Sequence, residues 1–246
     1  MFNSKNGENE SHENEYIKPN NLVDSIQQYV VDQIRMNRWK QGDRIDELLI
    51  VNELNVSRNS VREALSRLAA LHALEKRHWS GYYIPVITRE QADLTLQVRI
   101  LLEKYAMELF MPRITAQLIT EIENAVNQSE DAINNNDYYA FNKYDVVIHT
   151  IIKENCGNPW LAHFLDQIRF VLVLLMQMEE TEDRVIRFTR NSVVEHRKII
   201  EAMKQRNANQ AVELIVQHLE YHRARIEKIF IECSHQAQTS SADKEP

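Results

Sequence analysis

The chain has 246 residues, a formal net charge of −7 and an apolar share of 43%, so it can form one large domain or two small ones. It contains only four glycines and five prolines, which favours long helices and few turns. The two cysteines have no Cys-x-x-Cys spacing, which argues against a thiolate zinc site and is typical of a reducing compartment. The N-terminus has no signal-peptide pattern, and no apolar run approaches the ~20 residues that span a bilayer. We therefore expect a cytoplasmic protein with no membrane segment.

The N-terminal third predicts a tail followed by three helices. Residues 1–19 are polar and acidic, and we expect them to be a disordered tail. Apolar spacing predicts a helix over 22–36 and a short one over about 46–54. The next stretch, Asn55–Leu65, reads NVSRNSVREAL, in which Ser57 is a good N-cap for a third helix.

Two short extended runs around the pair Ser80–Gly81 then predict a β-hairpin. Helix, helix, turn, helix and hairpin form the outline of a winged helix-turn-helix domain over 20–87. In such a domain the second helix of the pair places its first turns against base edges and phosphates. Taken alone, such a stretch is more often a capped surface helix with solvated arginines, but the flanking elements favour DNA binding. The candidate DNA-binding residues supply guanidinium, hydroxyl and amide groups: Ser57, Arg58, Asn59, Ser60 and Arg62.

The rest of the chain has helical periodicity. Thr88, with Gln91 three residues later, predicts a capping box that opens the second domain. We expect an all-α antiparallel bundle over 88–233, followed by a disordered tail over 234–246. The predicted fold class is therefore mainly α, with a winged helix-turn-helix before a bundle of six helices. The six are expected at about 89–111, 115–134, 137–155, 159–179, 183–205 and 209–233.

Several polar side chains lie on the apolar faces of these helices. Asp145 and His149 border the apolar face of one helix, His196 lies within a stripe on a second, and His218 borders that of a third. One such histidine is usually a hydrogen-bonded core residue. One carboxylate and three imidazoles turned towards one interior suit a divalent ion such as zinc, nickel or manganese. We predict one ion per chain, with His222 as a neighbouring group.

The stretch NVSRNSVREALSRLAALHAL, with the later SGYYI, resembles the GntR family of bacterial regulators. Family members usually have Thr-Pro where this chain has Asn59 and Ser60. The resemblance implies that Arg58 and Arg62 contact DNA and that Gly81 lies in the wing.

The helical region is similar to the FadR C-terminal domain, called FCD, that accompanies this DNA-binding domain in one subfamily. The matching patterns are RILLE, DVVIH, EHRKIIEA and VQHL. This resemblance implies that Asp145, His149, His196 and His218 are the metal ligands. The predicted count of six helices resembles the VanR-like branch more than the seven-helix FadR type.

We therefore predict a regulator, acting as a repressor, that binds a palindromic operator as a homodimer. In such families a small carboxylate sits beside the metal and changes DNA affinity, and Arg99 is the candidate partner for that effector. Two alternatives stay open: a metalloenzyme with an accessory DNA-binding domain, and a regulator whose metal is structural or is itself the signal. The chain has no His-Glu-x-x-His motif and no clear general base, so the prediction is that it is not an enzyme.

Overall fold

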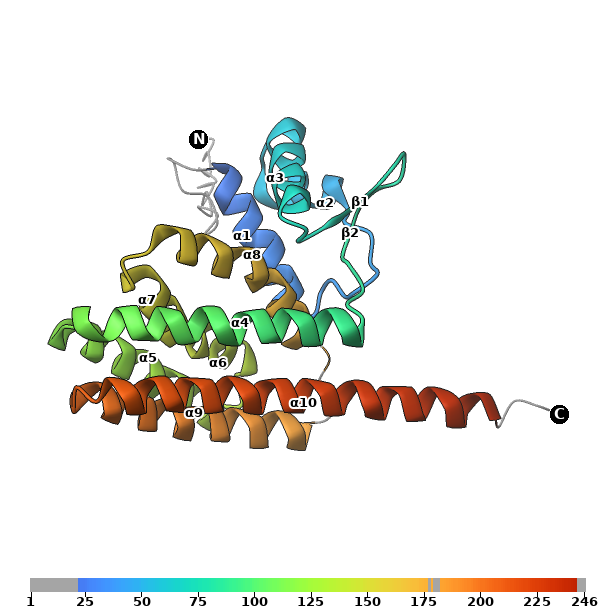
Figure 1. The fold of residues 1–246 in the computed structure, drawn as a ribbon. Coiled ribbons are helices and arrows are strands. Elements are labelled where there is room, and N and C mark those ends of the chain that lie inside the picture. The colour runs from blue at the N-terminus through green and yellow to red at the C-terminus, as the bar shows by residue number, and fades with distance from the viewer. Residues whose placement is uncertain (1–21, 177, 179–181, 243–246) are drawn as a thin grey trace, which may run out of the picture.

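A computed structural model describes residues 22–176, 178 and 182–242, and the predicted tail over 1–19 lies outside them. The N-terminal domain contains three helices and a hairpin (Figure 1). Their order is that of a winged helix-turn-helix, as predicted. The elements are α1 (Leu22–Arg35), α2 (Glu47–Leu54), α3 (Arg58–Ala70), β1 (Glu75–Arg77) and β2 (Gly81–Tyr83).

Local side-chain chemistry fixes the turn between α2 and α3. Asp46 caps α2 by accepting hydrogen bonds from two backbone amides of its first turn. Asn55 ends α2 in the left-handed conformation, with φ at 52°, which Asn tolerates better than most residues. Ser57 then caps α3 by accepting from the amide of Ser60. Only Asn55, Val56 and Ser57 separate the two helices, which are thus joined by a tight, capped turn.

The C-terminal domain is a helical bundle, and the predicted fold class is confirmed. Thr88 and Gln91 form the expected capping box at its start. The elements are α4 (Arg89–Phe110), the 3-10 helix η1 (Met111–Arg113), α5 (Ala116–Asn134), α6 (Tyr138–Asp145), α7 (Val147–Asn155), α8 (Pro159–Met176), α9 (Glu182–Lys204) and α10 (Ala208–Ala242).

The bundle differs from the prediction in two places. The helix expected over 137–155 is divided at Val146, which ends α6 with ψ at −10° and precedes the first residue of α7. The described part of this domain therefore has seven α-helices, and the helix count no longer favours the VanR-like branch. In addition, α10 continues to Ala242, beyond residue 233, because no Gly or Pro interrupts the chain there.

Two hydrophobic cores hold the molecule together. One lies inside the bundle, around Phe110, Phe141 and Ile200. The other is formed by the apolar side chains of the N-terminal domain together with side chains from α4, α8 and α10, among them Phe170 and Leu174. Helix α8 thus belongs to the bundle and packs on the DNA-binding domain, next to α1 (Figure 1). Among the described helices, none combines the length and apolarity that a bilayer crossing requires.

Candidate functional site

The first turns of α3 are open to solvent, and their polar residues fall into two groups. The hydroxyls of Ser57 and Ser60 lie 2.8 Å apart, and Ser57 Oγ accepts from Ser60 N at 3.1 Å. Both serines are therefore engaged in capping the helix. Arg58 and Asn59 are exposed, and their side chains extend from the end of the helix that a major groove would receive.

Arg62 lies one turn further along α3 and is held from one side. Its Nε donates to Glu47 Oε2 at 3.1 Å, while the side chain stays 65% exposed. This contact with α2 fixes the stem and leaves the outer guanidinium nitrogens facing solvent. Gly81, the predicted wing residue, opens β2 with φ at +97°, a conformation that side chains other than glycine adopt with strain.

Three of the four predicted metal ligands meet inside the bundle. His149 from α7, His196 from α9 and His218 from α10 each offer a ring nitrogen, and these nitrogens all lie within 4.8 Å of one another. The Nε2 atoms of His196 and His218 are 3.2 Å apart. Two nitrogens bound to one ion at 2.0–2.1 Å would be about 3.0–3.4 Å apart, so this spacing suits a shared ion.

Two glutamates that were not among the predicted site residues orient these rings. His149 Nδ1 donates to Glu103 Oε2 at 2.5 Å, and His218 Nδ1 donates to Glu195 Oε2 at 2.7 Å. Each carboxylate thereby places the ring proton on Nδ1 and leaves the Nε2 lone pair for an ion. Carboxylate–histidine pairs of this kind are the usual support of metal-ligating histidines.

Asp145, the fourth predicted ligand, lies beside His196. Its Oδ1 accepts from Ser192 Oγ at 2.6 Å and is 3.4 Å from His196 Nδ1, but His196 Nδ1 makes no hydrogen bond in the described structure. If His196 carries its proton on Nε2, its Nδ1 lone pair faces a carboxylate. If the proton is on Nδ1, two Nε2 lone pairs face each other. A bound cation removes this conflict, so these residues fit the predicted metal.

Burial keeps three of the imidazoles in this region neutral, as metal binding requires. Desolvation by burial is the main reason that the pKa values of His196, His218 and His222 lie well below the usual range. Burial alone would raise the pKa of Glu103, but Arg99 and His149 lower it far below its usual range. Glu103 is therefore ionised and can hold the Nδ1 proton of His149.

A small cavity adjoins the imidazoles. Its volume is about 60 Å³, and its polar lining consists of Arg99, Asp145, His149, His222 and Arg225. His222 Nε2 is buried without a hydrogen-bond partner in the described residues, although the residue as a whole is partly exposed. Arg225 stacks over the Phe188 ring at 3.4 Å, and burial lowers its pKa to about 9. Two guanidinium groups beside a prospective metal ion make this cavity suitable for an anion.

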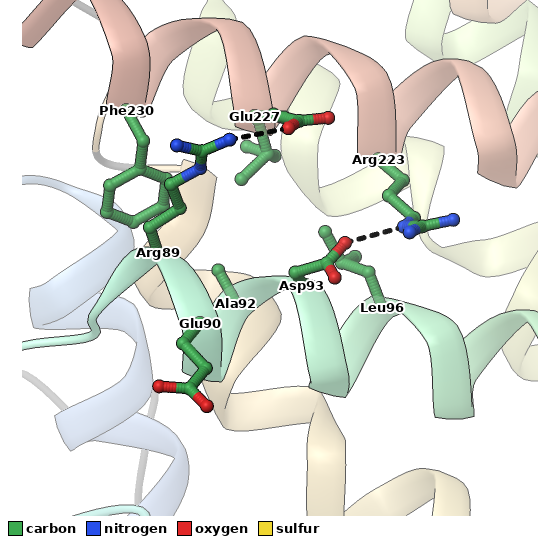
Figure 2. A pocket seen from close by; sticks show the side chains of 9 residues that line it. Arg89, Glu90, Ala92, Asp93, Leu96, Arg223, Glu227 and Phe230 are labelled. Atoms are coloured by element: carbon green, nitrogen blue, oxygen red, sulfur yellow. Dashed lines mark hydrogen bonds and ion pairs between the residues drawn. The ribbon is translucent and has the colours of Figure 1, made fainter.

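A larger surface hollow of about 320 Å³ lies between α4 and α10 (Figure 2). Four of the five charged groups that line it are paired across the two helices: Arg89 with Glu227 and Arg223 with Asp93, both at 2.7 Å. A ligand would have to displace these ion pairs. The hollow is therefore a weaker candidate for an anion site than the cavity beside the histidines.

The groups that support the imidazoles leave only an incomplete signal in the sequence. Glu103 ends the RILLE motif, four residues after Arg99, and the structure joins Arg99 Nε to Glu103 Oε1 at 2.5 Å. Glu195 immediately precedes His196. Neighbouring residues point about 100° apart on a helix, so only the packing of α9 against α10 brings Glu195 to His218. No sequence pattern singled out Arg225.

Comparison with known families agrees with both halves of this arrangement. The pattern described as "Bacterial regulatory proteins, gntR family" matches residues 22–84, and the FCD domain matches residues 94–221. The FCD match spans more than half of the chain. The chain belongs to the GntR family, in the group that carries an FCD domain. The predicted resemblance is confirmed, and the VanR-like branch stays a prediction.

Relatives of this GntR-family chain are regulators. The HTH-type transcriptional regulator YdhC of Bacillus subtilis is 26% identical over 188 residues, covering 74% of this chain and 81% of that protein. LutR of the same organism is 27% identical over 209 residues, covering 76% and 92%. The structure of E. coli McbR/YncC has a TM-score of 0.75 at 17% identity, covering 84% and 97%, which shows the fold. The chain is thus a transcriptional regulator and not an enzyme.

Proposed function

We propose that this GntR-family regulator represses transcription in the cytoplasm by binding a palindromic operator as a homodimer, and that a small organic acid beside a divalent metal controls its operator affinity. The observation that most strongly supports this proposal is the group of three imidazoles next to Arg99 and Arg225. The Gluconate operon transcriptional repressor of Bacillus subtilis, 22% identical over 195 residues, is named as a repressor. That name supports repression as the direction of control.

The exposed first turns of α3 support operator binding through Arg58, Asn59 and Arg62. Arg58 and Arg62 can each form two hydrogen bonds with guanine or with phosphate oxygens. The domain is close to electroneutral, with nine Lys and Arg against eight Asp and Glu over 20–88. Affinity must therefore come from a few placed contacts and from two half-sites, which requires a dimer.

A stripe on α4 supports a homodimer formed through the helical domain. Leu94, Val98, Leu101 and Tyr105 are 54%, 45%, 68% and 48% exposed. Their spacing places them on one face of the helix, within about one and a half turns on either side of its middle. A contiguous exposed apolar stripe on a regulator marks an interaction surface. A two-fold axis near Leu101 would let two copies of this stripe cover each other.

The effector site follows from the donors around the cavity. The ion, once bound by the imidazoles, supplies a positive centre for a carboxylate oxygen. Arg99 uses Nε to bind Glu103. Its two terminal nitrogens therefore remain to donate side by side to the oxygens of the effector's carboxylate. His222 Nε2 and Arg225 lie on the same wall and suit a further hydroxyl or carboxylate. A small organic acid with more than one oxygen function matches this lining.

The size of the cavity supports control of DNA binding. A volume of about 60 Å³ is the space of roughly two water molecules, so an organic acid must displace lining side chains. Leu172 and Leu175 of α8 are among them. Leu175 also packs in the core that contains the DNA-binding domain, and Gln41 Nε2 donates to Leu174 O at 3.0 Å. A shift of α8 would therefore move the DNA-binding domain and, with it, the DNA-reading helix α3.

Operator titration tests this proposal. A duplex that the protein selects from a random pool is titrated by fluorescence anisotropy after chelation, after adding Zn²⁺, Ni²⁺ or Mn²⁺, and after adding a 2-hydroxy acid, a sugar acid or a tricarboxylate. We expect a carboxylate to change affinity only in the presence of metal, and Arg99→Ala to abolish the response. Lys104→Ala, an exposed change on the same helix, is the control. A response to metal alone would favour a metal sensor and contradict the effector proposal.

A further inference from the structure

The turn of the hairpin carries an aromatic pair that the fold does not explain. Trp79 is 98% exposed and adopts a positive φ of 63°. Its ring stacks on that of His78, with centroids 4.8 Å apart and planes inclined by 26°. Turn positions with positive φ favour Gly, Asn or Asp, and a large apolar ring gains stability from leaving water. Both preferences oppose tryptophan at this position in the isolated protein.

The strands beneath the pair form a stiff and basic support. The hydroxyls of Ser80 and Tyr83 are hydrogen-bonded at 2.6 Å. Arg77 stacks over the Tyr83 ring at 4.0 Å, and Lys76 lies 5.7 Å from the centroid of the Tyr82 ring. These contacts hold the hairpin in one shape, so that the aromatic pair projects from an ordered base.

The hairpin and the recognition helix face each other across an open groove of about 710 Å³. Its lining includes the carboxylates of Glu47 and Glu63, together with basic, polar and aromatic residues of α3 and the hairpin: Arg62, Ser66, Lys76, Arg77, His78 and Trp79. A phosphodiester strand separates the major groove of DNA from the adjacent minor groove. With α3 in the major groove, that strand would lie in the open groove of the protein. The aromatic pair would then reach the minor groove on the far side of the strand.

We propose that Trp79, backed by His78, enters the minor groove beside the base pairs read by α3 and acts as a wedge against them. This inference rests on the proposed operator binding and adds a specificity-determining residue to it. Apolar side chains inserted from the minor groove favour steps that unstack easily. The exocyclic 2-amino group of guanine lies in that groove, so the wedge should disfavour G·C pairs at the site of insertion.

Affinity and specificity are measured on the full-length protein with a duplex selected by the wild type from a random pool. Stacking of one aromatic side chain accounts for about tenfold or more in affinity, so we expect Trp79→Ala to lose at least about tenfold and Trp79→Phe to recover most of it. Leu71→Ala removes an exposed apolar side chain at the other end of α3 and should bind as the wild type does. Thermal unfolding should be the same for these variants, because Trp79 packs on no core residue.

The groove is identified with two further duplexes that carry inosine·cytosine or guanine·cytosine pairs on the flank next to the hairpin. These pairs present nearly the same major-groove pattern and differ in the 2-amino group of the minor groove. The wild type should prefer the inosine flank by about tenfold, and Trp79→Ala should lose the preference. Equal binding of the wild type to both flanks, or Trp79→Ala that binds as tightly as Leu71→Ala, would overturn the wedge while operator binding still stands. Failure of the wild type to select any duplex would overturn both proposals.

Discussion

The buried imidazoles make the metal-free protein sensitive to mild acid. In the folded state burial lowers the pKa values of His196 and His218 well below the usual range, whereas the unfolded chain titrates near 6.5. Below that pH the histidines are protonated in the unfolded state but stay neutral in the folded state. The free energy of unfolding therefore falls as pH falls.

The magnitude follows from linkage. Each histidine that stays neutral in the folded state lowers the free energy of unfolding by about 1 kcal/mol between pH 6.5 and 5.5. His222, whose pKa burial also lowers, adds to His196 and His218, so that the three together give about 3 kcal/mol, against a typical total of about 5–15 kcal/mol. Glu195 acts in the opposite direction, because burial raises its pKa. Because their pKa values are lowered, His196 and His218 remain neutral, and therefore able to bind a metal ion, below the pH at which an unperturbed histidine would be protonated.

Urea unfolding of chelator-treated protein at the two pH values measures this effect. His196→Asn should reduce the difference between the two pH values by about 1 kcal/mol, since Glu195 contributes equally to both proteins. His163→Asn, at an exposed position on α8, should leave the difference unchanged. A free energy of unfolding that does not vary over this range in the wild type, or an equal difference in His196→Asn, would refute the assignment of neutral buried imidazoles.

Three further predictions concern the other surfaces. Arg58→Ala should weaken operator binding about tenfold or more without loss of helical content by circular dichroism. Arg67→Ala, at the far end of the same helix, should have little effect, and similar losses for both variants would contradict recognition by the first turns of α3. Leu101→Glu should give monomers in analytical ultracentrifugation at micromolar concentration, while Val194→Glu, an exposed change on α9, should leave dimers; a dimeric Leu101→Glu would exclude the α4 stripe. Glu195→Ala should weaken metal affinity about 10–100-fold in a competition titration with a chromogenic chelator, and unchanged affinity would show that Glu195 does not support the site.

Much of the fold was predictable because its signals are local. Ser57, and Thr88 with Gln91, mark helix starts through side-chain capping, and the structure forms these caps. The division of one helix at Val146 was missed, since apolar spacing continues across the break. The position of α8 was also beyond prediction: its apolar residues report that they are buried, but not that the DNA-binding domain covers some of them.

The candidate site was predictable in its ligands and not in its supports. His196 lies within an apolar stripe and His218 borders one, and both positions are visible in one sequence. Glu103, by contrast, lies 46 residues from His149, and Glu195 meets its partner from another helix. Asp145 and Ser192 are joined in the same way. Such pairings are set by helix packing, which apolar periodicity does not encode.

Metal content by elemental analysis, after reconstitution with Zn²⁺ and desalting, tests the central claim most directly. The wild type and Arg99→Ala should each hold one ion per chain, since a guanidinium does not ligate metal, and His196→Ala should hold none. Arg99→Ala should also bind its operator with no response to carboxylates. Equal metal content in the wild type and His196→Ala, or none in either, would show that the imidazoles are ordinary hydrogen-bonded core residues.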